Sequence, residues 1–290
     1  MQLRILTLNV RGLADRDKRQ TLFHLLRTWS ADIYCLQEVH APPDASTLWS
    51  MEWGGVAHWN KHTAILFPRP LGCTTFDVLY DGRVLSSTFQ HRGRTYTIAN
   101  LYLPAQKTER LRFLDDLTQH HSLSFSSYDF LVGDWNMYPD SSRDRTAIPD
   151  SYTRAASFST WPHFTTFIAS FYDAALLGHP SSSFFTFYRG LRDRPSMQSR
   201  IDHVFAHYRH STLTLSTQVT PYANSDHSAV LVSFSDDSSS SFLLHPLIPA
   251  TFPRTLFTLL LFPYSALIVL LLTGMPQRFW LVLMHRIMHT

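Results

Sequence analysis

The segment DFLVGDWN at residues 129–136 places a short apolar run directly before an acid and an amide. The run from Phe130 to Gly133 has the length and composition of a buried strand that ends in a turn. Asp134 and Asn136 are two residues apart, so in an extended chain they point to the same side. That pair suits phosphodiester hydrolysis, because the acid can orient or deprotonate a water while the amide donates to a phosphate oxygen. An Asx turn after a buried strand is the structural alternative.

Apolar runs of similar length recur on both sides of this segment and predict the fold class. We expect strands at 3–10, 32–39, 63–67, 84–90, 95–103, 130–133, 200–206 and 228–234, and a hairpin turn at 91–94. Apolar residues at helical spacing predict amphipathic helices over 18–29 and 109–120. Many strands with few helices between them favour two packed sheets flanked by helices over a doubly wound parallel sheet.

The composition is that of a folded chain with little net charge. Of its 290 residues, 44% are hydrophobic and 14% aromatic, enough to bury a large core, so disorder is not the default. The formal net charge is only +3, so a grip on nucleic acid would have to come from local basic clusters. Most of the basic residues are arginines, and the only lysines are Lys18, Lys61 and Lys107. The planar guanidinium of arginine can form two parallel hydrogen bonds to phosphate oxygens. A codon bias of the source genome would give the same composition.

Cysteine usage and the first residues bear on the compartment. Cys35 and Cys73 have no partner at metal-ligand spacing, which argues against a disulfide scaffold and against a zinc site. Residues 3–8 look like a strand and show no basic-then-apolar signal pattern, so we expect no secretion. Both features favour a reducing compartment.

The composition changes sharply at residues 236–242, DDSSSSF, a polar low-complexity stretch that is typical of a linker. We therefore expect one folded domain over 1–235 and an apolar tail over 243–290. Within the tail, 256–273 is a run of 18 uncharged residues interrupted by Pro263, at the lower edge of length for a membrane span. Three alternatives stay open for the tail: a transmembrane anchor, a hydrophobic interaction segment, or residual translation of a degraded or truncated element.

Four further polar islands lie where predicted strands begin or end. They are LNVRGL at 8–13, LQEVH at 36–40, SRIDH at 199–203 and NSDHS at 224–228. Asn9 ends a strand and Glu38 follows one directly, although turn formers and exposed acids are also common at such positions. His227 is the most specific signal, because a carboxylate such as Asp202 on a neighbouring strand would fix its tautomer and raise its basicity. His203, beside Asp202, is expected to be structural.

The order of these islands resembles one superfamily closely. Members of the exonuclease-endonuclease-phosphatase group carry an Asn-bearing first strand, a Gln-Glu island, a Gly-Asp-x-Asn island, an Ile-Asp-His or Ile-Asp-Tyr strand and a terminal Ser-Asp-His. This chain has all of them in that order, from Met1 to about Phe234. The resemblance implies an α/β fold: a four-layer α/β/β/α sandwich of two mostly antiparallel sheets flanked by helices, with the active site at one edge of the sheets.

The resemblance also implies a metal site and a catalytic group at that edge. Glu38 would bind Mg²⁺, with Asn9 and Asp226 as further ligands nearby. Hard oxygen ligands favour Mg²⁺ or Mn²⁺ over zinc. Asp134 would activate the water, and Asn136 would hold the scissile phosphate.

A second set of implied roles concerns the transition state and the branch of the superfamily. His227, oriented by Asp202, would stabilise a phosphorane-like transition state. Pancreatic deoxyribonuclease and bacterial sphingomyelinases have a second catalytic His in the region of NLYLPA, residues 100–105. AP endonucleases and LINE-type endonucleases have a Tyr there, whose hydroxyl can bond the phosphate, so Tyr102 points toward the branch that acts on DNA.

Further details resemble the endonuclease domain of LINE-type (non-LTR) retrotransposons. They are LTLNVRGL at 6–13, QEVH at 37–40 and FTF at 185–187. By that likeness Thr186 would contact DNA, and Arg11 is expected to bind substrate. Arg11 also stands where AP endonucleases have an acidic residue, a departure that weakens only an abasic-repair function. An ordinary aromatic-rich strand is the structural alternative for Thr186.

We therefore expect a Mg²⁺-dependent endonuclease that nicks DNA, as in LINE-type integration, with DNA as its partner, no inferred protein partner and a nuclear location. One alternative is a membrane-anchored phosphodiesterase or phosphatase of the same superfamily that acts on a lipid headgroup or phosphoinositide, with the tail in the membrane. Tyr102 argues against it. The other alternative is an inactive retroelement remnant, which the intact motif set argues against.

Overall fold

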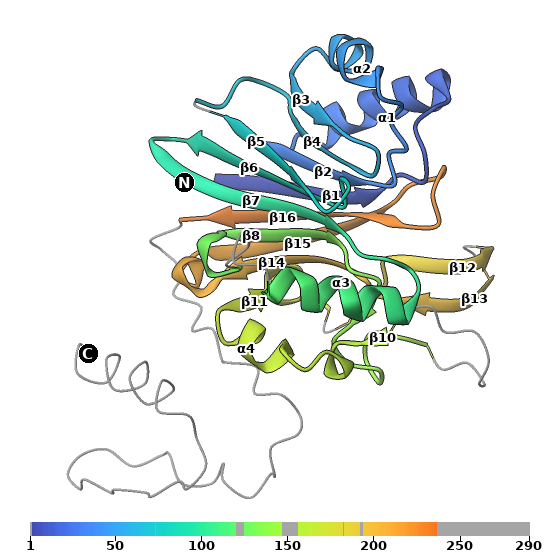
Figure 1. Ribbon diagram of the computed structural model, residues 1–290, viewed down its shortest axis with the longest axis vertical. Coiled ribbons are helices and arrows are strands. Elements are labelled where there is room, and N and C mark those ends of the chain that lie inside the picture. The colour runs from blue at the N-terminus through green and yellow to red at the C-terminus, as the bar shows by residue number, and fades with distance from the viewer. Residues whose placement is uncertain are drawn as a thin grey trace, which may run out of the picture. The chain divides into compact units, whose positions relative to one another are not determined.

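The computed structural model describes residues 2–72, 74–119, 125–146, 156–181, 183–191 and 194–236. Within them, two six-stranded sheets pack face to face and helices cover their outer faces (Figure 1). The predicted four-layer α/β/β/α sandwich is confirmed.

The first sheet has the strand order β15-β16-β1-β2-β4-β3. Its strands are β1 (Gln2–Asn9), β2 (Ile33–Gln37), β3 (Val56–Trp59), β4 (Thr63–Phe67), β15 (Thr214–Pro221) and β16 (Ser228–Ser235). Neighbouring strands are antiparallel except β1 and β2, which run parallel. The last strand therefore lies beside the first, which brings the two ends of this region together.

The second sheet has the order β11-β14-β8-β7-β6-β5 and the same pattern, with only β7 and β8 parallel. Its strands are β5 (Thr75–Leu79), β6 (Val84–His91), β7 (Arg94–Tyr102), β8 (Phe130–Asp134), β11 (Phe171–Asp173) and β14 (Asp202–His207). Two small pairs complete the strands: β9 (Met137–Tyr138) with β10 (Ala156–Ser157), and β12 (Phe187–Leu191) with β13 (Arg194–Ser199).

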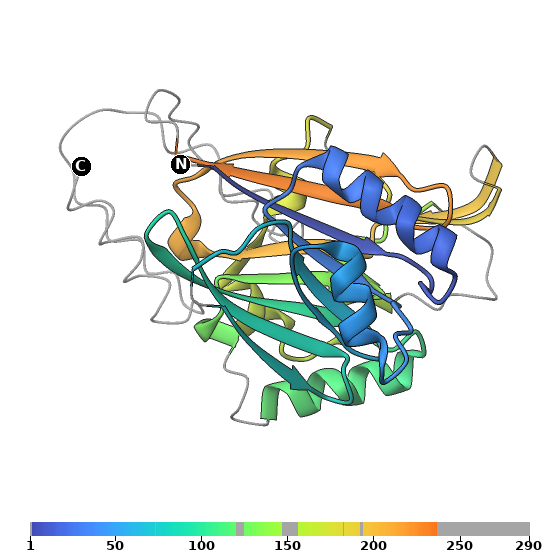
Figure 2. The same ribbon diagram turned by 90° about the horizontal axis from the view of Figure 1, so that it is seen from above.

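The helices lie outside the sheets, as Figure 2 shows for α1 and α3. They are α1 (Arg16–Trp29), α2 (Ala45–Trp53), α3 (Lys107–Gln119), α4 (Phe164–Ile168) and α5 (Ala174–Leu177), with 3₁₀ turns at Phe125–Ser127, Phe158–Thr160 and Tyr208–His210. The helix α1 begins where the Asp15 side chain accepts from the Lys18 amide at 2.7 Å, a standard N-cap. Both predicted helices, 18–29 and 109–120, match α1 and α3 to within two residues over their described parts.

Strand alternation divides the apolar residues between three cores. Ile5 of β1 faces the second sheet, whereas its neighbour Leu6 faces α1 and α2. In the same way Ile98 of β7 lies between the sheets, and Ala99 lies under α3 and α4. The central strands of each sheet are therefore buried on both faces.

Some predictions differ from the observed elements. The strand predicted over 32–39 ends at Gln37, because Glu38 and His40 adopt positive φ angles of 53° and 51°. The predicted hairpin at 91–94 is confirmed: β6 and β7 are joined through Arg92 and Gly93, both at positive φ, which is a type I′ turn. The four edge strands of the two sheets, β3, β5, β11 and β15, were not predicted.

The predicted tail 243–290, its candidate span 256–273 and nearly all of the linker 236–242 lie outside the described residues. Among the residues that are described, no helix has the length and apolar character needed to cross a bilayer. The domain boundary predicted at residue 235 stays a prediction.

Candidate active site

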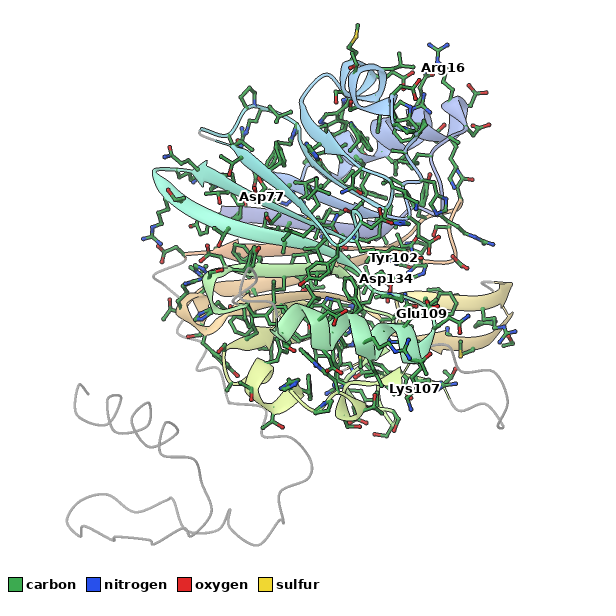
Figure 3. All side chains as sticks on the ribbon, in the orientation of Figure 1. Arg16, Asp77, Tyr102, Lys107, Glu109 and Asp134 are labelled. Atoms are coloured by element: carbon green, nitrogen blue, oxygen red, sulfur yellow. The ribbon has the colours of Figure 1, made fainter. Side chains whose placement is uncertain are left out.

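Six strands bring polar ends to one edge of the sandwich. The parallel pairs β1–β2 and β7–β8 end there, and the antiparallel strands β14 and β16 begin there. In the second sheet the register sets Tyr102 opposite Asp134 and Asp134 opposite Asp202. Figure 3 shows Tyr102 and Asp134 together at this edge.

Four predicted residues form a chain of hydrogen bonds between the two sheets. Asn9 uses both hydrogens of its amide: Nδ2 donates to Glu38 Oε1 and to Asp134 Oδ2, each at 2.9 Å. The Tyr102 hydroxyl donates to the same Glu38 Oε1 at 3.0 Å. The Asn9 oxygen accepts the backbone amide of Arg11 at 3.1 Å. Asn9 therefore spaces two carboxylates in this structure, where the sequence predicted it as a metal ligand.

Asn136 lies beside Asp134, as its spacing predicted, but its amide also has a structural partner. The Asn136 backbone N–H donates to Asp134 Oδ1 at 2.9 Å, the Asx-turn geometry that was the structural alternative. Its side-chain Nδ2 donates to the carbonyl of Leu103 at 2.9 Å. The turn thus fixes the Asp134 carboxylate. Among the described residues Nδ2 has this one partner, so its second hydrogen can donate to a substrate.

His227, which directly precedes β16 of the first sheet, lies between two carboxylates of the second sheet. Its Nδ1 lies 2.9 Å from Asp202 Oδ2, and its Nε2 lies 3.9 Å from Asp134 Oδ2. All three side chains are buried, and their ligand atoms lie within 4.8 Å of one another. The predicted pairing of His227 with Asp202 is therefore present in the structure.

Burial and mutual charge set the protonation of this group. Burial and the charge of Asp202 raise the pKa of Asp134. Burial by itself would lower the pKa of His227, but the charge and hydrogen bond of Asp202 raise it, which favours the imidazolium. Burial and the nearby carboxylate of Glu38 raise the pKa of Tyr102, so its hydroxyl keeps its proton.

Backbone strain gathers at the same edge. Arg11, Glu38 and Asn136 are non-glycine residues at φ angles of 54°, 53° and 51°, in the left-handed region. Such conformations cost about 1–3 kcal/mol each and persist only where the surroundings enforce them. Each of the three directly follows, or lies two residues beyond, the last residue of a strand that ends at the edge.

Asp226 lies on the rim of the site, apart from the buried group. Its carboxylate pairs with the Arg11 guanidinium at 3.5 Å, and the two side chains are 33% and 63% exposed. The main chain of Asp226 accepts the amide of Tyr188 in β12 at 2.9 Å. The structure therefore places Asp226 against a cation, where the sequence predicted a metal ligand, and leaves Arg11 largely exposed to a substrate.

Thr186 is fully buried, so its side chain does not present itself to DNA in this structure. Its hydroxyl accepts the backbone amides of Ile201 and Asp202 at 3.1 and 3.2 Å. These bonds hold the start of β14 and hence the Asp202 carboxylate. The DNA contact that the resemblance implied for Thr186 stays a prediction, and the pattern FTF does not tell which face of the chain is covered.

A buried ionic network beneath Asp202 was missed. Arg200 pairs with Asp144 at 2.9 Å and with Asp173, and both Arg200 and Asp144 are fully buried. His203 bonds Asp173 through Nδ1 at 3.1 Å and the Met137 carbonyl through Nε2 at 2.9 Å, which confirms that it is structural. The only sequence signal was the Arg that precedes Ile-Asp-His.

Ser225 is a second residue near the site that the sequence did not predict. Its hydroxyl donates to the Asn9 carbonyl at 2.8 Å and accepts the His227 amide at 3.1 Å. It therefore ties the loop that carries His227 to the end of β1. The only sequence signal for Ser225 is its place as the first residue of the Ser-Asp-His motif.

Comparison with known families decides the assignment. The family model of the endonuclease/exonuclease/phosphatase family matches residues 6–227. The chain belongs to this family. The matched region spans the strands that deliver the buried group, from β1 to His227, so the edge cluster is the candidate active site of an endonuclease/exonuclease/phosphatase hydrolase.

Individual relatives agree with that membership. The uncharacterized 149 kDa protein of transposon TX1 from Xenopus laevis is 28% identical over 245 residues, and the match covers 79% of this chain but 18% of that protein. The chain thus spans less than a fifth of that relative. Among solved structures, an AP endonuclease from Archaeoglobus fulgidus is similar with a TM-score of 0.65 at 18% identity, covering 81% of this chain and 100% of that one.

A third similarity is to a retrotransposon enzyme. The endonuclease domain of TRAS1, a telomere-specific non-LTR retrotransposon, has a TM-score of 0.53 at 13% identity, covering 81% of this chain and 99% of that one. At these identities the solved structures establish the shared fold.

The donor set fits the divalent metal on which enzymes of this family depend. Glu38, Asp134 and Asp202 gather hard oxygen donors at the edge. Among the described residues, Glu38 Oε2 has no hydrogen-bond partner, whereas Oε1 accepts two bonds. The pKa of Asp134 is raised by burial and by Asp202, and a cation would relieve that repulsion. Glu38 and Asp134 are therefore the residues that would hold the metal.

Proposed function

We propose that this chain is a Mg²⁺- or Mn²⁺-dependent endonuclease that nicks DNA, as in the integration of LINE-type retrotransposons. The observation that carries the proposal is the group of His227, Asp202 and Asp134, with Nε2 of the imidazole 3.9 Å from Asp134. The similarity to a transposon protein supports DNA as the phosphodiester substrate, and a nuclear location goes with it.

In the proposed reaction, Asp134 accepts a proton from a water while the oxygen of that water adds to phosphorus in line with the 3′ oxygen. Burial and the charge of Asp202 raise the pKa of Asp134 while no metal is bound, and a bound cation would instead lower the pKa of the attacking water. The P–O3′ bond then breaks with its electron pair, and the 3′ oxygen is protonated from solvent. The products are a 3′-hydroxyl and a 5′-phosphate.

His227 would act on the charge that develops in the transition state. Its Nδ1 is held by Asp202, so a proton on Nε2 can be donated to a non-bridging phosphate oxygen. A metal bound at Glu38 and Asp134 would supply a fixed positive charge beside the same oxygens. Tyr102, through its hydroxyl on Glu38, keeps that carboxylate facing the site.

The test is nicking of supercoiled plasmid by the purified full chain, with Mg²⁺ or with EDTA. Asp134→Asn and His227→Ala should each lower the rate about 10³-fold or more, because each removes a proton-transfer or charge-stabilising group. Asp77→Asn is the matched control: Asp77 is exposed on edge strand β5, away from Tyr102 and Asp134 in Figure 3.

Metal-dependent nicking by the wild type and Asp77→Asn, with loss of nicking in Asp134→Asn and His227→Ala, would support the proposal. A folded chain that leaves the plasmid intact in Mg²⁺ and Mn²⁺ would refute it. Assay of the same preparation on phosphoinositides and sphingomyelin then tests the alternative of a lipid phosphodiesterase.

A further inference from the structure

Directly beneath the site, a layer of polar side chains lies between the two sheets. Thr7 of β1, Gln37 of β2 and Asn100 of β7 are each 0% exposed. The residues two positions earlier on the same strands are apolar and belong to the core between the sheets: Ile5, Cys35 and Ile98. Side chains two apart on a strand share a face, so the polar layer rests on the apolar core.

The same strands carry the site just beyond this layer. Asn9 and Tyr102 lie two residues after Thr7 and Asn100, and Glu38 directly follows Gln37. The positions of these three site residues are therefore set by the three residues of the buried layer, which precede them on the same strands. A shift of one sheet against the other would move Tyr102 away from Glu38.

Hydrogen bonds connect the layer from sheet to sheet. Gln37 Nε2 donates across the gap to Asn100 Oδ1 at 2.7 Å. Within the first sheet it also donates to Thr7 Oγ1 at 3.0 Å, and this bond holds the Gln37 amide in place. Asn100 Nδ2 donates to the carbonyls of Leu36 and Ala64, each at 2.9 Å. Asn100 therefore makes three hydrogen bonds across the gap, all of them to the first sheet.

Stability alone does not call for such a layer. Apolar packing between two sheets is favourable but non-directional, so it resists sliding only through the shape of the side chains. Replacing a satisfied buried polar group and its partner by apolar groups of similar shape is often neutral or stabilising. Hydrogen bonds, in contrast, fix distance and direction. A fully satisfied polar layer one step below the site thus suits alignment better than it suits stability.

We propose that Thr7, Gln37 and Asn100 form a positioning triad, which holds the two sheets in the register that brings Tyr102 to Glu38. The triad acts through these residues and touches no reacting atom. This proposal extends the proposed function, and the nicking assay in its test relies on that function. Second-layer contacts of this kind typically change metal affinity 10–100-fold when they are lost.

The test compares Mn²⁺ binding, by calorimetry, of the full chain and two variants. Thr7→Val is nearly isosteric and removes one hydroxyl. The double variant Gln37→Leu with Asn100→Leu makes the layer apolar. We expect the half-saturating Mn²⁺ concentration to rise about tenfold or more in the double variant, and about threefold in Thr7→Val. The Tm of the double variant should fall, because the carbonyls of Leu36 and Ala64 lose the Asn100 amide. The nicking rate of the double variant should fall about 100-fold, as expected for a misplacement near 1 Å.

Ile98→Val is the matched control, because it removes one methylene from the core between the sheets, two residues before Asn100, and no hydrogen bond. Its Tm should fall while its Mn²⁺ midpoint and its nicking rate stay at the wild-type values. Wild-type Mn²⁺ midpoints in both triad variants, or an equal shift in Ile98→Val, would overturn the proposal. If the double variant does not fold, the Mn²⁺ midpoint of Thr7→Val decides whether the triad positions the site.

Failure of the proposed function gives a different result. A wild-type chain that binds Mn²⁺ but does not nick DNA would refute the endonuclease, and the Mn²⁺ midpoints would still decide the triad. A wild-type chain that binds no Mn²⁺ would refute the triad as a device for placing Glu38.

Discussion

The imidazole of His227 reaches from the first sheet to the second, with Nδ1 2.9 Å from Asp202 Oδ2. His227 directly precedes β16, which pairs with β1, whereas Asp202 begins β14, which pairs with β8. Asp134, 3.9 Å from Nε2, ends β8. One side chain of the first sheet is thus oriented by one carboxylate of the second sheet and aimed at another, so its chemistry depends on how the two sheets are aligned.

Asp202→Asn should abolish most activity while the chain stays folded. The amide keeps the size of the carboxylate but can no longer stabilise an imidazolium or select the Nδ1–H tautomer. In a comparable carboxylate–histidine pair, the same change lowers kcat about 10⁴-fold. Plasmid nicking under saturating DNA, beside Asp77→Asn, measures the effect. A loss below about tenfold would show that Asp202 does not orient His227 for the reaction.

The site residues that the sequence predicted are those at which an apolar strand ends in a polar residue. Runs such as LTL before Asn9 and FLVG before Asp134 fix both a strand and the place where it ends, so strand-end residues converge once the strands pair in register. The pairing of His227 with Asp202 followed from the motif order. These predictions needed only local apolar runs and the resemblance of the motifs.

Other features depend on tertiary contacts that no local pattern contains. The edge strand β15 has a mixed burial pattern and lacks an apolar run, since only one side of it is paired. Thr186 accepts the amide of Ile201, fifteen residues away and directly before β14, and the pairing of Arg200 with Asp144 spans fifty-six residues. The resemblance implied Asp226 near the metal, but its pairing with Arg11 depends on a contact that spans more than two hundred residues.

Arg200→Leu should destabilise the fold strongly. The substitution leaves the carboxylates of Asp144 and Asp173, which are 0% and 11% exposed, without their main cation. Removing one partner of a buried ion pair typically costs about 3–5 kcal/mol. Urea unfolding of the variant measures the change. Arg69→Leu is the control: it breaks a pair with Asp32 in which the Arg69 side chain is 66% exposed, and it should cost about 1 kcal/mol or less. Similar losses in both would contradict the assignment of the network.

Asp129 should give the fold an acid-sensitive contribution to stability. Its carboxylate accepts the Thr97 amide at 2.7 Å and pairs with Arg209 and His210, each at 2.7 Å. Burial would raise its pKa, but the bonds from His210 and Thr97 and the charge of Arg209 lower it. A depressed pKa in the folded state means that the contribution is complete above the ordinary aspartate pKa, about 3.9, and is lost as the pH falls through the folded value.

The measurement for this prediction is the free energy of unfolding between about pH 5 and pH 2, for the wild type and Asp129→Asn. The difference between the two should shrink toward zero as the pH falls. Asp77→Asn, on an exposed position of β5, should leave the wild-type pH profile unchanged. A difference that stays constant down to the lowest pH would mean that the carboxylate charge of Asp129 does not stabilise the fold.

Arg11 should contribute to DNA affinity more than to the chemical step. Its side chain is 63% exposed beside the site, and its only ion pair among the described residues is the 3.5 Å contact with Asp226. A phosphate could replace Asp226 on the guanidinium at little cost, because an exposed pair is worth about 0–1 kcal/mol. Arg11→Ala should therefore weaken binding of duplex DNA and lower the slope of log affinity against log salt by about one.

Fluorescence anisotropy in EDTA, where nicking is suppressed, measures that slope. Arg16→Ala is the matched control, because Arg16 is 73% exposed and also pairs with an acid at 3.5 Å, but it lies on α1, away from Tyr102 and Asp134 in Figure 3. If only Arg11→Ala changes the slope, the edge that carries His227 faces the DNA backbone. Equal slopes in both variants would place the DNA-binding surface elsewhere on the domain, and the role given to Arg11 would be wrong.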